Sequence, residues 1–134
     1  MYNLWTRSLF FLPAYAIVKT IDNIETYSSV AIADVRPDLP GKEIFISSCF
    51  NKGNNSSDAY LFGWNASGDP LAGWQPKVLL DRCAGSTVTL ADLDPAYPGL
   101  EVAVGVKVME TYGGEVYAWH ADGTSISGSQ WPQP

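Results

Sequence analysis

Acidic side chains recur at the same turn in two stretches of the chain. The stretches read ADVRPDLPGKEIFIS, from Ala33 to Ser47, and ADLDPAYPGLEVAVG, from Ala91 to Gly105, and they align without a gap. Carboxylates in a turn accept hydrogen bonds from loop amides and tie the turn shut, while prolines lower the entropy of the unfolded chain. Clustered carboxylates also suit acid–base catalysis, but that interpretation requires a substrate cleft.

The two turns differ in charge at one position. The acidic candidates are Asp34, Asp38 and Glu43 in the first copy and Asp92, Asp94 and Glu101 in the second. Arg36 stands where the second copy has Asp94. We expect this guanidinium to form hydrogen-bonded ion pairs with the neighbouring carboxylates.

Histidine offers little for catalysis. His120 is the only histidine, and it follows Trp119 in a turn where the other copy carries Asn65. A turn role is therefore expected in place of general-base catalysis. We also find no Ser-His-Asp arrangement and no glycine-rich phosphate loop, and we expect no catalytic residues.

Composition limits the classes of partner. The chain has 134 residues, of which 46% are hydrophobic and 16% charged, and it carries a net charge of −6. Its eight basic residues are scattered, which argues against a nucleic-acid surface. No apolar run approaches the roughly 18 residues that span a bilayer. We expect one globular unit that neither binds nucleic acid nor spans a membrane.

The aligned turns belong to a longer internal repeat. The same register holds for SSVAIADV against STVTLADL and for EIFISSCF against EVAVGVKV. The tryptophans that follow, Trp64 and Trp119, are slightly closer together than this register requires, since the second copy has a shorter loop. Trp5 precedes Asp34 by almost the same interval as Trp64 precedes Asp92. We therefore expect the chain to begin in the middle of a repeat.

Each repeat is expected to form four short strands. The first strands, 30–35 and 88–93, are small and apolar enough to be enclosed on both faces. The second strands are 43–50 and 101–108, the third carry alternating aromatic residues up to Trp64 and Trp119, and a fourth runs through 71–80. Turns are expected at 65–69 and 120–123. No segment has a helical period, so the predicted fold class is all-β.

Repeating four-stranded antiparallel units fit a β-propeller, in which blades pack against each other. The strand order, the acidic turn and the VYAWHADGT segment resemble the FG-GAP or VCBS class of repeat, the integrin-α-like propellers. The resemblance implies about two and a half blades: the end of a blade in 1–27, a first complete blade in 28–85 and a second in 86–134. Such an arc is either part of a larger propeller or a subunit that completes it by association.

The resemblance also implies a metal site. Such repeats often carry a calcium-binding D-x-D-x-D-G-x-x-D/E loop, and Asp92, Asp94, Gly99 and Glu101 are similar to it. Pro95 to Pro98 departs from this pattern and is similar to the D-x-D-P-x-x-P-G-x-E turns of propeller-type rhamnogalacturonan lyases. Calcium at Asp92, Asp94 and Glu101 and a turn tied by hydrogen bonds both stay open. At Asp34, Asp38 and Glu43 the charge of Arg36 disfavours calcium.

In the propeller layout, Cys49 and Cys83 lie at one end of the blade and are candidates for a disulfide, with two free thiols as the alternative. Most aromatic rings are expected between blades, whereas Trp74 and Trp131 are expected to be exposed at strand ends.

These features together favour a non-catalytic extracellular or cell-surface module for binding, adhesion or assembly, with further blades, copies of itself, a glycan or a protein as candidate partners. The alternatives are part of a secreted polysaccharide lyase or hydrolase, and a self-assembling ring or filament subunit.

Overall fold

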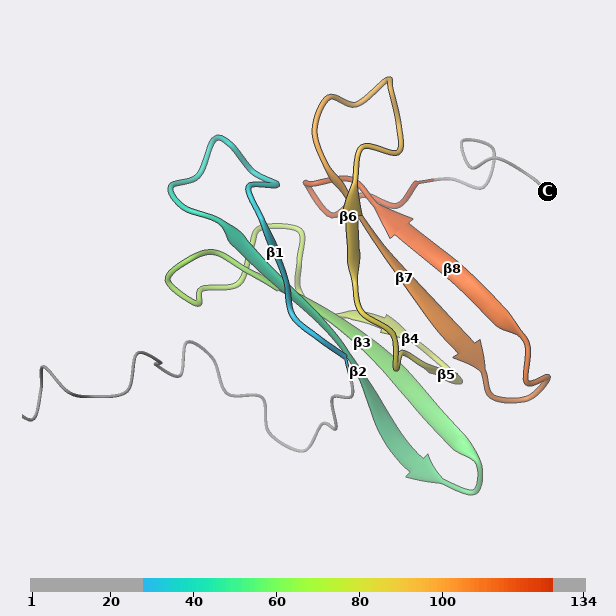
Figure 1. The fold of residues 1–134 in the computed structure, drawn as a ribbon. Helices are drawn as coiled ribbons and strands as arrows, with labels where there is room; N and C mark the ends of the chain where they lie inside the picture. The colour runs from blue at the N-terminus through green and yellow to red at the C-terminus, as the bar shows by residue number, and fades with distance from the viewer. Residues whose placement is uncertain (1–27, 127–134) are drawn as a thin grey trace, which may run out of the picture.

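The computed structural model describes residues 28–126, which form two four-stranded antiparallel sheets (Figure 1). The all-β prediction is confirmed, because these residues form strands and turns without a helix. Within the same range no helix is long and apolar enough to cross a membrane. Trp5 and Trp131, with the strands expected around them, lie outside the described residues.

The first sheet has its strands in chain order, as the repeat predicts. They are β1 (Ala31–Ala33), β2 (Glu43–Gly53), β3 (Ser56–Trp64) and β4 (Lys77–Leu79). The fourth strand is shorter than the predicted 71–80. Gly73 has a φ of +81° there, and Pro70 and Pro76 cannot donate to a strand ladder, so most of this segment forms a loop.

The second sheet is built around β7 (Glu101–Val108). One edge of β7 pairs with β8 (Gly114–Trp119), and the other edge pairs with β6 (Thr89–Ala91) and β5 (Arg82–Cys83). The short strand β5 lies within the predicted first blade, 28–85, but belongs by pairing to the second sheet. Equivalent residues are paired alike in both sheets, since Phe45 lies opposite Gly63 and Ala103 opposite Ala118.

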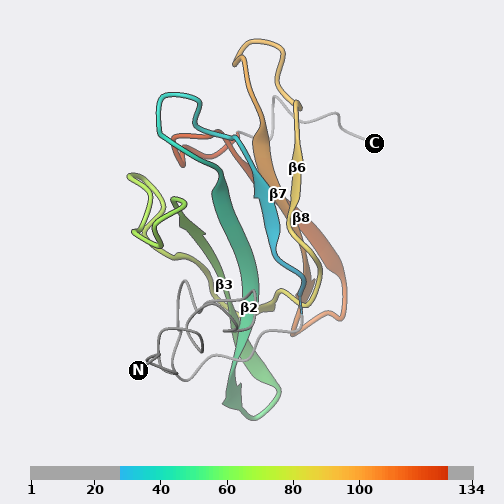
Figure 2. The same cartoon turned by 60° about the vertical axis from the view of Figure 1, so that its left-hand side comes forward.

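The core lies between the two sheets (Figure 2). Side chains alternate between the two faces of a strand, so Phe45, Ala59 and Leu61 of β2 and β3 share the face of the first sheet that contributes to the core. In the second sheet, the same alternation along β7 brings Val102, Val104 and Val106 into this core. All six side chains are at least nine-tenths buried. The two sheets therefore pack face to face as successive copies of one unit.

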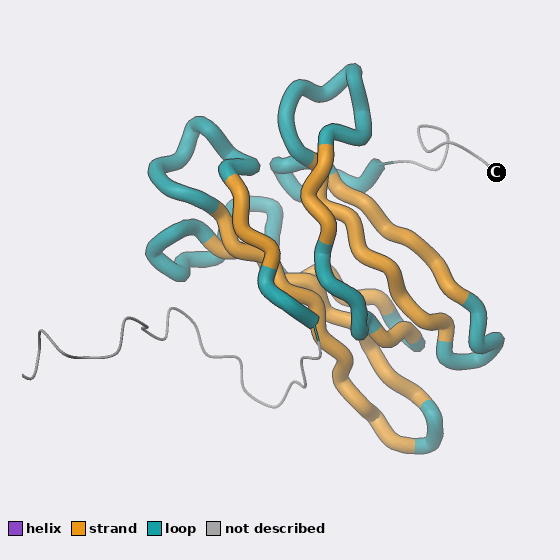
Figure 3. Tube along the Cα trace, in the orientation of Figure 1, coloured by secondary structure: helices purple, strands orange, loops and turns teal. Residues whose placement is uncertain are grey.

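The first strand of each repeat is less enclosed than expected. β1 and β6 lie beside each other at sheet edges, and the side chain of Ile32 in β1 is 58% exposed. Each has only three residues because the acidic turn begins at once, and that turn projects from the same end of both sheets (Figure 3).

Trp74 anchors one sheet on the other, and the expectation that it is exposed is wrong. Its side chain is 1% exposed, its Nε1 donates a hydrogen bond to the carbonyl oxygen of Ala121 at 2.9 Å, and its ring packs edge-on against Phe45 and Trp119. A β-carbon at Gly63 would meet the Phe45 ring and the β-carbon of Trp74, so this packing requires glycine. Burial of this ring depends on a turn of the other repeat, which the local sequence does not indicate.

Candidate functional site

Glu101 closes the second acidic turn from within. It begins β7, its side chain is 2% exposed, and its Oε2 accepts hydrogen bonds from the backbone N–H groups of Leu93 at 2.6 Å and Asp94 at 3.2 Å. Asp94 in turn accepts a hydrogen bond from the N–H of Ala96 through Oδ1. The loop is thus held by its own carboxylates: Glu101 accepts loop amides as the hydrogen-bonded interpretation expected, and Asp94 accepts where Asp92 was expected to.

His120 faces both of these carboxylates. Its Nδ1 lies 3.6 Å from Glu101 Oε1, its Nε2 lies 3.9 Å from Asp94 Oδ2, and the Tyr97 ring stacks on the imidazole with centroids 3.9 Å apart. The backbone of His120 does form the expected turn, accepting a hydrogen bond from Gly123 N–H. Its side chain, however, is 5% exposed, and the sequence interpretation did not predict this burial. The imidazole therefore stands between the two acidic groups.

The three predicted calcium ligands of the second turn do not gather at one point. Asp94 and Glu101 approach each other through His120, whereas Asp92 is exposed. Among residues 28–126 no group of three or more His, Cys, Asp or Glu side chains is arranged to hold a metal ion. Asp94 Oδ2 is nevertheless a buried carboxylate oxygen without a hydrogen-bond partner in this range. Calcium at this turn stays a prediction of the sequence.

The first turn uses the same internal carboxylate with a different charge pattern. Glu43, fully buried, accepts hydrogen bonds through Oε2 from the N–H groups of Val35 at 2.8 Å and Arg36 at 2.9 Å. The guanidinium of Arg36 donates two hydrogen bonds to exposed Asp38, which raise the pKa of Arg36 and lower that of Asp38. Asp34 is exposed and lies outside this network. The expected ion pair is formed with Asp38.

A cleft of about 310 Å³ separates the two turns. Arg36 and Asp38 line one side, and Tyr97, His120 and Asp122 line the other. Hydrogen bonds from Thr124 hold the pKa of Asp122 below its usual value, and the charges of His120 and Arg36 lower it further. The cleft combines charged and apolar side chains of both repeats.

Cys49 and Cys83 are joined by a disulfide in the structure. Cys49 lies in β2 and Cys83 in β5, so the bond crosses from the first sheet to the second. Beside it, Ser47 Oγ donates a hydrogen bond to the carbonyl oxygen of Ser86 at 2.7 Å. Polar and covalent links thus join the repeats at this end.

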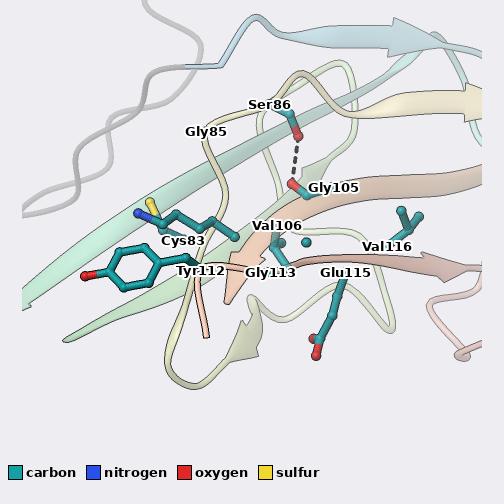
Figure 4. A pocket seen from close by; sticks show the side chains of 11 residues that line it. Cys83, Gly85, Ser86, Gly105, Val106, Tyr112, Gly113, Glu115 and Val116 are labelled. Atoms are coloured by element: carbon teal, nitrogen blue, oxygen red, sulfur yellow. Dashed lines mark hydrogen bonds between the residues drawn. The ribbon is translucent and has the colours of Figure 1, made fainter. Parts of the chain in front are cut away.

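A second groove, of about 580 Å³, is lined by residues of β5, β7 and β8 and of the loops next to them (Figure 4). Ser86 donates a hydrogen bond to the Gly105 carbonyl at its margin, and Figure 4 shows Val116 and Glu115 pointing to opposite sides of β8. We call the groove side of this sheet the open face, defined by Gly105, Lys107, Gly114 and Val116.

The open face corresponds to a face that is covered in the first sheet. Strand pairing places Gly105 opposite Val116 and Lys107 opposite Gly114, as it places Ser47 opposite Leu61 and Cys49 opposite Ala59. We call the latter four residues the covered face, since they face the second sheet. Leu61 is 2% exposed on the covered face, and its equivalent Val116 is 57% exposed.

Sequence reasoning named the acidic turns but missed His120, Tyr97 and the open face. The repeat alignment already contained a signal for the open face, because it aligns Gly105 with Ser47 and Lys107 with Cys49. His120 follows directly after the pairing of Trp119 with Val102, so its neighbour Glu101 belongs to the same β7–β8 hairpin, whereas Asp94 belongs to the acidic turn before β7.

No protein-family model, curated protein or solved structure matches this chain.

Proposed function

We propose that the chain is a non-catalytic repeat module of the β-propeller type that serves binding, adhesion or assembly outside the cell. The observation that carries this proposal is the open face. Each sheet has a face suited to packing against a further layer, and in the second sheet this face is exposed at Val116. An apolar hollow of this kind on a protein surface is typical of an interaction site.

The chemistry of the acidic turns favours the non-catalytic role over a polysaccharide lyase. Glu43 and Glu101 are committed to backbone N–H groups, and Asp38 is paired with Arg36. A catalytic acid or base must instead reach a substrate proton. The chain should therefore leave pectin-like polysaccharides uncleaved, as followed by the ultraviolet absorbance of unsaturated products. Appearance of that absorbance would establish the lyase alternative.

Calcium stabilisation at Asp92, Asp94 and Glu101 is a second part of the proposal. Its support is the buried oxygen of Asp94 without a hydrogen-bond partner, a hard ligand of the kind that calcium takes. Calcium should raise the melting temperature of the native chain and not that of Asp94→Asn. Asp38→Asn is the matched control, because Asp38 lies in the first turn beside Arg36. Equal responses of native chain and Asp94→Asn would remove calcium from the proposal.

The disulfide supports the extracellular location, since such bonds persist mainly in oxidising compartments. Thiol counting on the denatured chain isolated from its native source should find no free thiol. Two free thiols would instead argue for a reducing compartment.

A further inference from the structure

The two sulfurs of the disulfide differ in their access to the surface. Cys49 in β2 is 6% exposed, whereas Cys83 is half-buried and lines the groove of about 580 Å³. Figure 4 shows the sulfur of Cys83 among the side chains of this groove. A groove of this volume is large enough for a small molecule. A reagent that enters the groove therefore reaches the disulfide at Cys83 and not at Cys49.

A lysine stands next to the accessible sulfur. Strand pairing sets Lys107 of β7 directly opposite Cys83 of β5, so the two side chains leave the sheet on the same face as close neighbours. The ammonium of Lys107 lies 4.6 Å from the centre of the Tyr112 ring, and no carboxylate within residues 28–126 forms an ion pair with it. Its charge is therefore available to an anion in the groove.

The other charged side chain that lines the groove is already neutralised. Glu115 forms an ion pair with Arg82, whose Nε lies 2.7 Å from Oε2 and whose Nη2 lies 3.0 Å from Oε1. Much of the remaining lining is glycine, at Gly85, Gly105, Gly113 and Gly114. An anion that enters this groove therefore meets one unpaired charge among the described residues, the ammonium beside Cys83.

We propose that the groove is a site of thiol–disulfide exchange, in which a small anionic thiol attacks Cys83 and remains attached to it as a mixed disulfide. The thiol first loses its proton to water, because the thiolate is the nucleophile. A bond forms between its sulfur and Cys83 Sγ, the bond from Cys83 Sγ to Cys49 Sγ breaks, and the Cys49 thiolate takes a proton from water. One disulfide replaces another without net oxidation. Lys107 is the positioning residue, since its charge attracts the thiolate.

The exchange removes the covalent link between the two sheets. Cys49 belongs to the first sheet and Cys83 pairs into the second, so the sheets are afterwards held by the apolar core and by hydrogen bonds such as that from Ser47 Oγ to Ser86. The Cys49 thiol stays beside the mixed disulfide and attacks it in turn, which makes the modification reversible.

The probe is reduced glutathione, a small thiol with a net negative charge, and 2-mercaptoethanol is the neutral comparison. The folded native chain is incubated with each thiol over a range of concentrations, free thiols are blocked by alkylation, and the cysteine peptides are identified by mass spectrometry. Glutathione should be found on Cys83 and the alkyl group on Cys49. An adduct mainly on Cys49, an equal distribution over both cysteines, or no adduct on the folded chain would overturn the inference.

Substitution of the lysine tests the role of charge. Lys107→Glu should slow the reaction with glutathione by about tenfold, as is typical of encounters steered by charge, and should change the reaction with 2-mercaptoethanol little. Lys107→Arg should keep the native rate. Lys42→Glu is the matched control, because Lys42 is exposed and lies outside the groove. Equal slowing of both thiols, or equal rates in Lys107→Glu and Lys42→Glu, would overturn the inference.

A second variant tests the groove by volume instead of charge. Val116 lines the groove and is 57% exposed, so the indole of Val116→Trp should fill the groove and slow both thiols. Thermal unfolding of each variant checks that it is folded. Unchanged rates in a folded Val116→Trp chain would overturn the inference, because the disulfide would then be reached from elsewhere.

Discussion

The carboxylates of Glu43 and Glu101 hold the two acidic turns by the same pair of backbone hydrogen bonds. Both are almost completely buried, and both accept from the second and third residues after the first strand of their repeat. A buried carboxylate satisfied by backbone N–H groups forms the stronger, charge-assisted kind of hydrogen bond. The part of the turn that both repeats share is therefore structural.

Removal of this carboxylate should destabilise the protein. Glu43→Ala leaves the buried N–H of Val35 and the partly buried N–H of Arg36 without an acceptor, and we expect a loss of about 2–4 kcal/mol in the free energy of unfolding. Glu43→Gln keeps one acceptor oxygen and should lose less. Urea unfolding measures both, with exposed Asp38→Ala as the control that changes little. Similar losses for Glu43→Ala and Asp38→Ala would contradict the structural role.

At the scale of elements, the hairpin of β2 and β3 is tied to the turn before β5 by charged groups. Lys52 Nζ lies 2.7 Å from Asp58 and 3.3 Å from Asp81, and Ser56 Oγ donates a hydrogen bond to Asp81. The hydrogen bond from Lys52 lowers the pKa of Asp58, and that from Ser56 lowers the pKa of Asp81. Charged carboxylates are thus favoured by the folded state.

This cluster should make stability depend on pH in the acidic range. A carboxyl whose pKa is lowered on folding stabilises the native state above its ordinary value, 3.8 for aspartate, and the contribution is lost as the pH falls through the lowered value. Urea midpoints measured against pH should decline below this value. Asp58→Asn should decline less steeply than the native chain. An identical slope in the variant would show that the cluster does not couple folding to protons.

The contact between the turn of β8 and the loop before β4 leaves no room for a side chain. Gly123 has a φ of +84°, and a β-carbon there would overlap the Gly73 carbonyl oxygen. Lys77 Nζ donates hydrogen bonds to the carbonyl oxygens of both glycines. This is a place where the two sheets approach each other closely through backbone.

Gly123→Ala should therefore separate the sheets at this end. We expect a loss of about 2 kcal/mol or more in the free energy of unfolding, from backbone strain and steric overlap together. Gly85→Ala is the control, since a β-carbon at Gly85 meets nothing within 4 Å. Chemical denaturation followed by tryptophan fluorescence would report the change directly, as Trp74 lies at this contact. Equal stability of the two variants would contradict the close approach.

At the scale of the whole molecule, the two sheets are joined by an apolar core and a disulfide. The core includes Phe45 and Leu61 from the first sheet and Val104 from the second. The disulfide between Cys49 and Cys83 spans 34 residues of sequence. Loop-closure entropy makes a cross-link of that span worth about 3–4 kcal/mol.

Reduction should lower the melting temperature of the whole molecule. The double variant Cys49→Ser, Cys83→Ser should melt at about the temperature of the reduced native chain, and adding reductant should not change it. This comparison separates loss of the disulfide from other effects of the reagent. Differential scanning calorimetry makes the comparison. If the melting temperature of the native chain does not change after reductant has freed both thiols, the disulfide is not a stabilising link.

Local pattern alone predicted much of this molecule. Alternating side chains and Gly or Asp turns indicated the strands ending at Trp64 and Trp119, and the aligned copies predicted equal pairing in both sheets. These features follow from contacts between neighbours in sequence or in one hairpin. Sequence therefore determined the all-β class, the repeat and the position of the acidic turns.

Only the tertiary structure decided which of those residues meet. Trp74 is buried against the other repeat, where Ala121 accepts its N–H, and His120 is covered by Tyr97 and Asp94 of the acidic turn, outside its own hairpin. The pairing of β5 with β7 likewise joins two segments that β6 separates along the chain. Such contacts depend on how one sheet packs on the next, which no local period encodes. The physical reason is that burial is a property of pairs of surfaces, whereas the sequence pattern describes one strand at a time.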